Sequence, residues 1–134
     1  MKKRILLVDD SDLMRGAVRN FLQQRLPSCE FLEAGDGKTG VEVARKHRPD
    51  VVIMDIRMPG VSGIEATRQI KLDRPNTAVV MFTLSDNPKQ RQAARQAGAC
   101  AYVLKDSGPE ELAKVVRRFA RGQRRRKGRP PCML

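Results

Sequence analysis

Aromatic side chains, histidine and cysteine are scarce in this chain of 134 residues, which has no tryptophan, one tyrosine, one histidine and three cysteines. The cysteines, Cys29, Cys100 and Cys132, share no spacing typical of metal ligands, and any disulfide would leave one of them unpaired. We therefore expect reduced thiols. The single histidine, His47, lies at the edge of an apolar helix face, so we expect a partly covered surface residue and no catalytic triad built on it.

Long apolar runs are also missing. No segment has the roughly 20 apolar residues that a membrane-spanning helix needs. At the N-terminus, Met1 and three basic residues lead into only four apolar residues, 5–8, before two aspartates, which does not fit a secretory signal. We therefore expect a cytoplasmic protein that does not contact a membrane, with room for a single domain.

Acidic residues are absent after Glu111, whereas positive charges concentrate toward the C-terminal end. The formal net charge is +12, and half of it comes from six arginines and lysines after Ala120. We therefore predict a folded domain over residues 1–120 and a basic tail or truncated linker over residues 121–134. Three interpretations of the tail stay open: a solvated helix end, a severed interdomain linker, or an arm that binds nucleic acid or an acidic partner.

Short apolar runs alternate along the chain with segments of helical periodicity. Strands are expected at residues 5–8, 30–34, 51–54, 78–82 and 101–104, and the continuous apolar runs at 5–8 and 51–54 are typical of strands buried on both faces. Helices are expected between and after them, at residues 13–22, 38–47, 64–70, 88–97 and from Pro109 onward. Five strand–helix units with right-handed crossovers predict an α/β fold with a doubly wound, five-stranded parallel sheet and helices on both faces.

Polar side chains follow four of the predicted strands: Asp9 and Asp10 after the first, Asp55 after the third, Thr83 after the fourth and Lys105 after the fifth. In a parallel sheet these ends share one edge, near which ligands bind. Each residue alone could simply cap the next helix, but their joint placement is hard to obtain by chance. Three neighbouring carboxylates repel one another unless a cation offsets them, and Mg²⁺ prefers such oxygen ligands. Lys105 adds a second positive charge and Thr83 a hydroxyl donor, which together favour phosphoryl transfer.

Four segments resemble the receiver domains of two-component response regulators. They are Val8-Asp9-Asp10, the stretch Asp-Ile-Arg-Met-Pro-Gly-Val-Ser-Gly at residues 55–63, Thr83, and Tyr102-Val103-Leu104-Lys105. The resemblance covers about residues 3–120, and the combination is highly specific. It implies the flavodoxin-like strand order 2-1-3-4-5.

The resemblance also implies roles for residues at the strand ends. Asp55 would be the phosphoacceptor, Asp10 a direct ligand of Mg²⁺ (or Mn²⁺), and Asp9 a nearby acid that acts through water. Asp55 itself and the backbone carbonyl of Arg57 would be the remaining protein ligands of the metal ion.

Thr83 and Tyr102 match the switch pair of the family, in which the hydroxyl group moves toward the phosphate and the ring turns inward. With Thr83 and Lys105 assisting transfer to Asp55, we expect a signalling switch rather than an enzyme. Such a switch promotes its own phosphorylation and dephosphorylation, and it shifts between two conformations to regulate an output.

The expected partners follow from the same resemblance. Because His47 is the only histidine, the phosphodonor is expected to be another protein, a histidine kinase or a phosphotransfer protein. Homodimerisation on phosphorylation is a further possibility that the sequence leaves open. After Lys105, the residues Asp106 and Ser107 are similar to receivers that precede a LuxR-type helix-turn-helix, although many receivers have proline at position 106. The expected output is therefore transcription, with nucleic acid contacted through such an output domain or weakly through the basic tail.

Two other functions fit the sequence less well. Residues 35–40 match the GxGxxG pattern of dinucleotide-binding proteins, but they belong to the second strand–helix unit, and Asp36-Gly37 is an ordinary turn before a helix. A metal-dependent phosphatase acting on small molecules usually has a second acid two residues after its aspartate, where this chain has Arg57. Such enzymes also need a cap over the substrate, for which this chain is too short.

Overall fold

A computed structural model of the chain describes residues 2–122 and 132–134. Strands and helices alternate along it, in the order β1 (Arg4–Val8), α1 (Asp12–Arg25), β2 (Glu30–Ala34), α2 (Gly37–His47), β3 (Val51–Met54), α3 (Gly63–Asp73), β4 (Ala78–Thr83), α4 (Pro88–Ala97), β5 (Ala101–Leu104), the 3₁₀ turn η1 (Lys105–Ser107) and α5 (Pro109–Gly122). All five predicted strands and all five predicted helices are present, with ends that differ by a few residues. Only η1 has no counterpart in the prediction.

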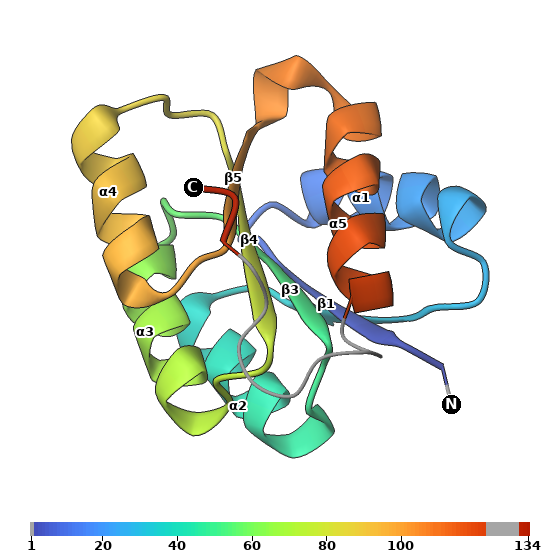
Figure 1. Cartoon of the computed structure of the whole chain (residues 1–134), viewed down its shortest axis with the longest axis horizontal. Helices are drawn as coiled ribbons and strands as arrows, with labels where there is room; N and C mark the ends of the chain where they lie inside the picture. The colour runs from blue at the N-terminus through green and yellow to red at the C-terminus, as the bar shows by residue number, and fades with distance from the viewer. Residues whose placement is uncertain (1, 123–131) are drawn as a thin grey trace.

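The five strands form one parallel sheet in the order β2-β1-β3-β4-β5, as predicted (Figure 1). In the register of this sheet, Val8 at the end of β1 lies between Ala34 of β2 and Met54 of β3. At the other side, Thr83 of β4 is paired with Leu104 of β5. The residues that follow these pairs therefore meet at one edge of the sheet.

Successive strand residues point to opposite faces of the sheet and build two apolar clusters. One cluster combines alternate strand residues such as Leu7 with Leu22 of α1 and Phe119 of α5. The other combines the intervening strand residues such as Leu6 with Ile70 of α3 and residues of α2 and α4. Accordingly, α1 and α5 cover one face, and α2, α3 and α4 cover the other (Figure 1). This accounts for the continuous apolar runs: a strand covered on both faces has no solvent side.

The glycines of residues 35–40 allow α2 to pack closely. A Cβ atom on Gly37 would lie 2.5 Å from the carbonyl oxygen of Val61, and one on Gly40 would lie 3.0 Å from the side chain of Val8. Asp36 is the N-cap of α2, and its side chain accepts a hydrogen bond from the backbone N–H of Thr39 at 2.8 Å. The turn before a helix is thus confirmed, and close contacts with the backbone of Val61 and the side chain of Val8 explain Gly37 and Gly40.

The C-terminal part of the chain is described only in part. Arg121 belongs to α5, whereas the remaining basic residues of the tail lie outside the described residues. Residues 132–134 lie beside the start of β5, where the backbone N–H of Met133 donates to the carbonyl of Cys100 at 2.6 Å. None of the helices in the described ranges combines the length and apolar character needed to cross a bilayer.

Candidate functional site

A cleft of about 450 Å³ opens at the carboxyl ends of the strands. Its lining contains six of the seven residues singled out from the sequence, namely Asp9, Asp10, Asp55, Arg57, Thr83 and Lys105, together with Ser11, Leu84 and Ser85. The seventh, Tyr102, contacts the loop that follows Thr83 instead. The strand order therefore gathers residues that are up to 96 positions apart in the sequence.

Three carboxylates lie together in the cleft. One oxygen from each of Asp9, Asp10 and Asp55 lies within 4.8 Å of the others. The adjacency of β1 and β3 explains this, since the backbone N–H of Asp55 donates to the carbonyl of Val8 at 3.0 Å. Asp9 and Asp55 are 7% and 8% exposed, whereas Asp10 is exposed.

The three carboxylates differ in how many of their oxygens are already engaged. Asp9 accepts from the backbone N–H of Ser11 with Oδ1 and from Lys105 with Oδ2, both at 2.9 Å. Asp55 accepts from the backbone N–H of Ile56 at 2.9 Å with Oδ1 and, more weakly, from Lys105 at 3.4 Å with Oδ2. Within the described part of the chain, Asp10 makes no hydrogen bond or ion pair, so its oxygens are free to bind a ligand.

Lys105 places its ammonium group between two of the acids. Its Nζ lies 2.9 Å from Oδ2 of Asp9 and 3.4 Å from Oδ2 of Asp55, and its side chain is 9% exposed. Burial lowers the pKa of Lys105, but the hydrogen bond to Asp9 and the charges of both acids raise it, and the net direction is upward. Lys105 therefore carries its positive charge at neutral pH.

The charge of Asp55 is only partly offset by this lysine. Burial raises the pKa of Asp55, the charge of Lys105 lowers it, and the charge of Asp9 raises it again, so that the pKa lies above its ordinary value of 3.8. One ammonium group is thus too little for three close carboxylates. A hard divalent cation such as Mg²⁺, which binds carboxylate oxygens and keeps several waters, fits this set of donors.

Thr83 and Tyr102 are linked through the loop between β4 and α4. Thr83 ends β4, is 2% exposed, and its hydroxyl has no hydrogen-bond partner among residues 2–122 and 132–134. Tyr102 is half-buried in β5, and its hydroxyl donates to the carbonyl of Ser85, two residues after Thr83, at 2.7 Å. The loop between β4 and α4 thus connects the cleft to the ring of Tyr102.

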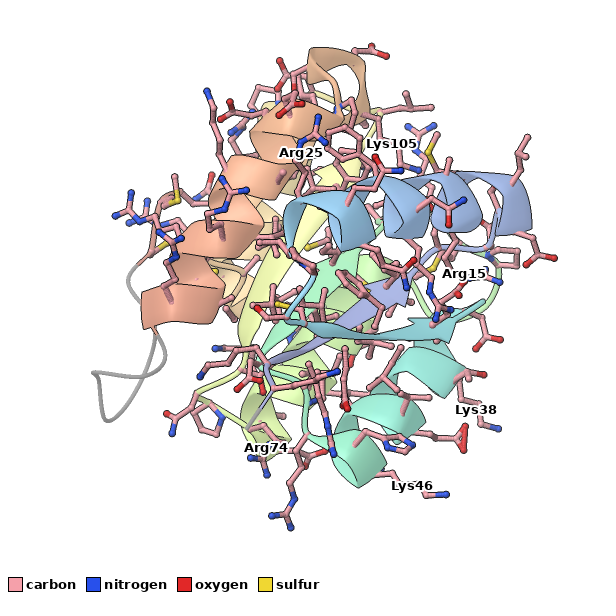
Figure 2. The ribbon with its side chains drawn as sticks, turned by 90° about the vertical axis from the view of Figure 1, so that its right-hand side faces the viewer. Arg15, Arg25, Lys38, Lys46, Arg74 and Lys105 are labelled. Atoms are coloured by element: carbon pink, nitrogen blue, oxygen red, sulfur yellow. The ribbon has the colours of Figure 1, made fainter. Side chains whose placement is uncertain are left out.

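Sequence reasoning missed a group of charged residues behind the acidic cluster. Arg15 extends from α1 toward β2 (Figure 2), where it donates to the backbone carbonyl of Asp9 at 2.6 Å and to Glu33 at 2.8 Å. Arg19 is also paired with Glu33, and the two arginines lower the pKa of that carboxyl, Arg19 most strongly. A glutamate within a mostly apolar strand was the available signal, because a partly buried acid needs a cationic partner.

Gly63 is the second feature that the sequence did not reveal. It begins α3, and its backbone N–H donates to the carbonyl of Ile56 at 2.9 Å, which closes the loop after Asp55. This close approach of α3 to the end of β3 requires a residue without a side chain. The Asp-to-Gly stretch at residues 55–63 is therefore a packed loop that fixes the backbone of Asp55.

Comparison with known proteins identifies the family of this chain. The family model of the response regulator receiver domain matches residues 5–117. The chain is 39% identical over 122 residues to the transcriptional regulatory protein YxjL of Bacillus subtilis, and 36% identical over 121 residues to the response regulator GacA of Pseudomonas aeruginosa. These alignments cover 91% and 90% of the chain but only 56% of either relative. The chain thus spans little more than half the length of the curated relatives.

Solved structures of response regulators have the same fold. A LuxR-family two-component response regulator from Aurantimonas sp. SI85-9A1 superposes with a TM-score of 0.84 at 34% identity, covering 91% of this chain and 87% of that one. The chemotaxis protein CheY4 of Vibrio cholerae superposes with a TM-score of 0.81 at 30% identity, covering 89% and 99% of the two chains.

Proposed function

The chain belongs to the family of response regulator receiver domains, and on that basis we propose that Asp55 is the residue that takes up the phosphoryl group. Phosphorylation and dependence on Mg²⁺ are general to this family. The observation that carries the assignment is the position of Asp55: it is nearly buried, next to two further acids, and within 3.4 Å of Lys105. A carboxylate oxygen of Asp55 attacks the phosphorus of the donor, a P–O bond forms, and the bond from phosphorus to the leaving group breaks.

Catalysis by this site is mostly positioning and charge stabilisation. Lys105 is held by Asp9 at 2.9 Å, close enough to Asp55 to stabilise the negative charge of an incoming phosphoryl group. The hydroxyl of Thr83, which has no partner among the described residues, donates to a phosphoryl oxygen. These two groups are the side chains that we assign to assisting the transfer. They make the chain a switch that promotes its own phosphorylation.

We assign the metal ion to the open side of the cleft. Asp10 and Asp55 would be its direct carboxylate ligands, and the backbone carbonyl of Arg57, a residue that lines the same cleft, would be a third. Asp9 would act through water, because Oδ2 of Asp9 holds the ammonium group of Lys105 at 2.9 Å, closer than the 3.4 Å between that group and Oδ2 of Asp55. A bound Mg²⁺ or Mn²⁺ would supply positive charge that offsets the acids and the incoming phosphoryl group.

The donor and the output are proposed from the family. Response regulators are partners of histidine kinases, and His47, the only histidine of this chain, is half-buried at the end of α2 rather than in the cleft. A histidine kinase or a phosphotransfer protein is therefore the donor. Regulation of transcription is the output, in line with relatives that include a transcriptional regulatory protein.

Incubation of the whole chain with acetyl phosphate and Mg²⁺ tests the assignment by intact mass. Wild type is expected to gain one phosphoryl group that is lost on acid treatment, and Asp55→Asn is expected to gain none. Asp106→Asn, which removes an exposed carboxylate in η1, serves as the matched control and should label like wild type. Efficient labelling of Asp55→Asn would overturn the assignment.

A further inference from the structure

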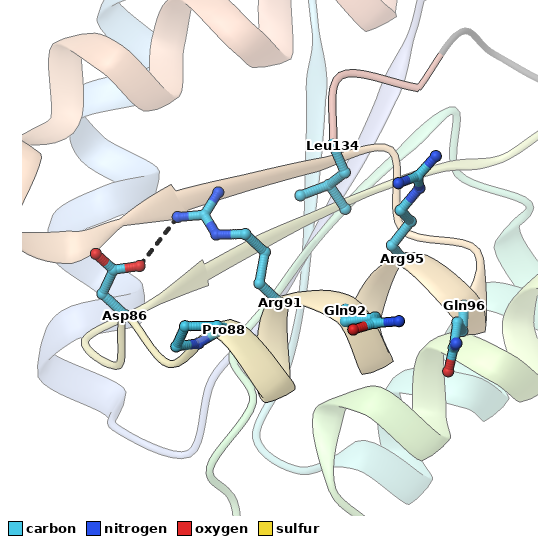
Figure 3. Close-up of a pocket in the computed structure, with 7 residues that line it drawn as sticks. All are labelled: Asp86, Pro88, Arg91, Gln92, Arg95, Gln96 and Leu134. Carbon is cyan, nitrogen blue, oxygen red and sulfur yellow. Dashed lines mark hydrogen bonds and ion pairs between the residues drawn. The ribbon is translucent and has the colours of Figure 1, made fainter.

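Arg91 contacts the one tyrosine of the chain. Its guanidinium carbon lies 4.5 Å from the centre of the ring of Tyr102. Its Nη2 donates to Oδ1 of Asp86 at 3.1 Å, as Figure 3 shows. The hydroxyl of the same tyrosine donates to the carbonyl of Ser85 at 2.7 Å. Two contacts thus hold the ring of Tyr102: the guanidinium of Arg91 over its face and the hydrogen bond of its hydroxyl group.

These contacts join β5 to α4 and to the loop that leads from β4 into α4. Arg91 is on α4, Tyr102 is on β5, and Asp86 and Ser85 are in the loop that follows Thr83. Because Ser85 is two residues after Thr83, a movement of that threonine toward the cleft also moves the carbonyl that holds Tyr102. Arg91 acts on the same loop through Asp86.

The composition of α4 explains why a cation covers the ring. Within this helix only Ala94 and Ala97 are buried, and its polar residues line a groove of about 640 Å³ with Leu134 (Figure 3). No large apolar side chain of α4 is available to pack on Tyr102. The planar guanidinium of Arg91 provides the covering surface, and the pair with Asp86 orients it.

We propose that Arg91 is a positioning residue for the phosphorylation switch of this chain, which acts by holding Tyr102 against the loop after Thr83. The inference rests on the proposed function, since the switch is the one that begins at Asp55. It predicts that Arg91 changes the balance between two positions of Tyr102 without touching the phosphoryl group. A contact of this kind shifts such an equilibrium by about two- to fivefold.

The chain offers its own reporter for the first step. Tyr102 is the only tyrosine and there is no tryptophan, so the intrinsic tyrosine fluorescence comes from this ring alone. In Arg91→Ala, acrylamide is expected to quench this emission more strongly than in wild type. Arg91→Lys keeps the charge but loses the planar face and should fall between them. Arg95→Ala removes an exposed arginine one turn further along the same groove and should match wild type.

The second measurement is the affinity of the whole chain for beryllofluoride in the presence of Mg²⁺, determined by ¹⁹F NMR. Arg91→Ala should change this affinity by about two- to fivefold, and Arg95→Ala should leave it unchanged. In a Tyr102→Leu background the effect of Arg91→Ala should disappear, because a double-mutant cycle isolates their interaction.

Three results would separate the proposals. Unchanged quenching in Arg91→Ala overturns the contact, and changed quenching with unchanged affinity overturns the positioning role. Absence of beryllofluoride binding in wild type counts against the proposed function itself, whereas the quenching comparison without beryllofluoride still tests whether Arg91 holds Tyr102.

Discussion

A Cβ atom placed on Gly63 would lie 1.9 Å from the carbonyl oxygen of Asp55. It would also lie 2.8 Å from the carbonyl carbon of the same residue, and both distances are far shorter than a van der Waals contact. The clashing atoms belong to the backbone, which cannot rotate away as the end of a side chain can. The absence of a side chain at Gly63, which does not line the cleft, therefore allows the backbone of Asp55 to take its position.

Gly63→Ala is expected to lower the free energy of unfolding by about 1–3 kcal/mol, the usual cost of forcing atoms into a packed interior. It should also slow labelling by acetyl phosphate, because Asp55 must shift. Gly16→Ala is the matched control. A Cβ atom added at Gly16 in α1 would have no neighbouring atom within 4 Å, and alanine there should raise the free energy of unfolding by about 0.5–1 kcal/mol. Urea unfolding measures both, and a wild-type midpoint for Gly63→Ala would contradict the reasoning.

Asp55→Asn is expected to be more stable than wild type at pH 7 in the presence of a chelator. The pKa of Asp55 in the folded protein is raised, by burial first, so the unfolded chain ionises this group more readily than the folded one. Wild type therefore loses stability as the pH rises from the ordinary value of 3.8 through the raised pKa, whereas asparagine does not ionise. Thermal melts of both proteins between about pH 3 and pH 8 check this. The difference should shrink toward low pH, and a difference that grew on acidification would be opposite in sign to the prediction.

Added Mg²⁺ should stabilise wild type, because a ligand that binds only the folded state shifts unfolding by mass action. At 100 times the dissociation constant, the gain is about 2.7 kcal/mol. Asp10→Asn removes the exposed carboxylate that has no partner among the described residues and should lose most of this gain. Asp106→Asn, again an exposed acid, should keep it. Equal Mg²⁺-dependent shifts in melting temperature for Asp10→Asn and wild type would argue against a metal site at this cluster.

The three free cysteines should react with iodoacetamide in a fixed order. Cys132 is exposed and should react first, and Cys29 is half-buried with a pKa raised by burial and should follow. Cys100 is 3% exposed, and burial raises its pKa to about 12, so it should react only on unfolding. Peptide mass mapping against time at pH 8 (roughly the ordinary thiol pKa) measures the order. Early labelling of Cys100 would show that the start of β5 opens locally.

The central strands β1, β3 and β4 could be predicted because they are covered on both faces. The run Val51–Met54 has its predicted bounds, and all four of its residues are buried. Arg4, which begins β1, could not be included, because its side chain is exposed and the strand extends there through pairing with Glu30. The turn at Lys105–Ser107 is set by local backbone geometry and carries no periodicity.

The site itself could be predicted only as far as strand ends determine it. Asp9, Asp55 and Lys105 follow strands, so the parallel topology places them at one edge whatever their rotamers. Contacts such as that of Arg15 with the carbonyl of Asp9 depend on how a long side chain crosses from a helix to the sheet. That of Arg91 with Tyr102 depends in the same way on how α4 lies beside β5. Neither leaves a pattern in the sequence.

The alternation of strand side chains has a further consequence for the interior. The clusters around Leu22 and around Ile70 are separated by the backbone of the sheet, so they form two separate apolar compartments. Space created in one compartment, for example by shortening Phe119, cannot be refilled by side chains of the other. A small apolar ligand such as xenon would therefore bind in the compartment in which the space was made. A cavity-creating substitution on one side of the sheet would leave the packing density of the cluster on the other side unchanged.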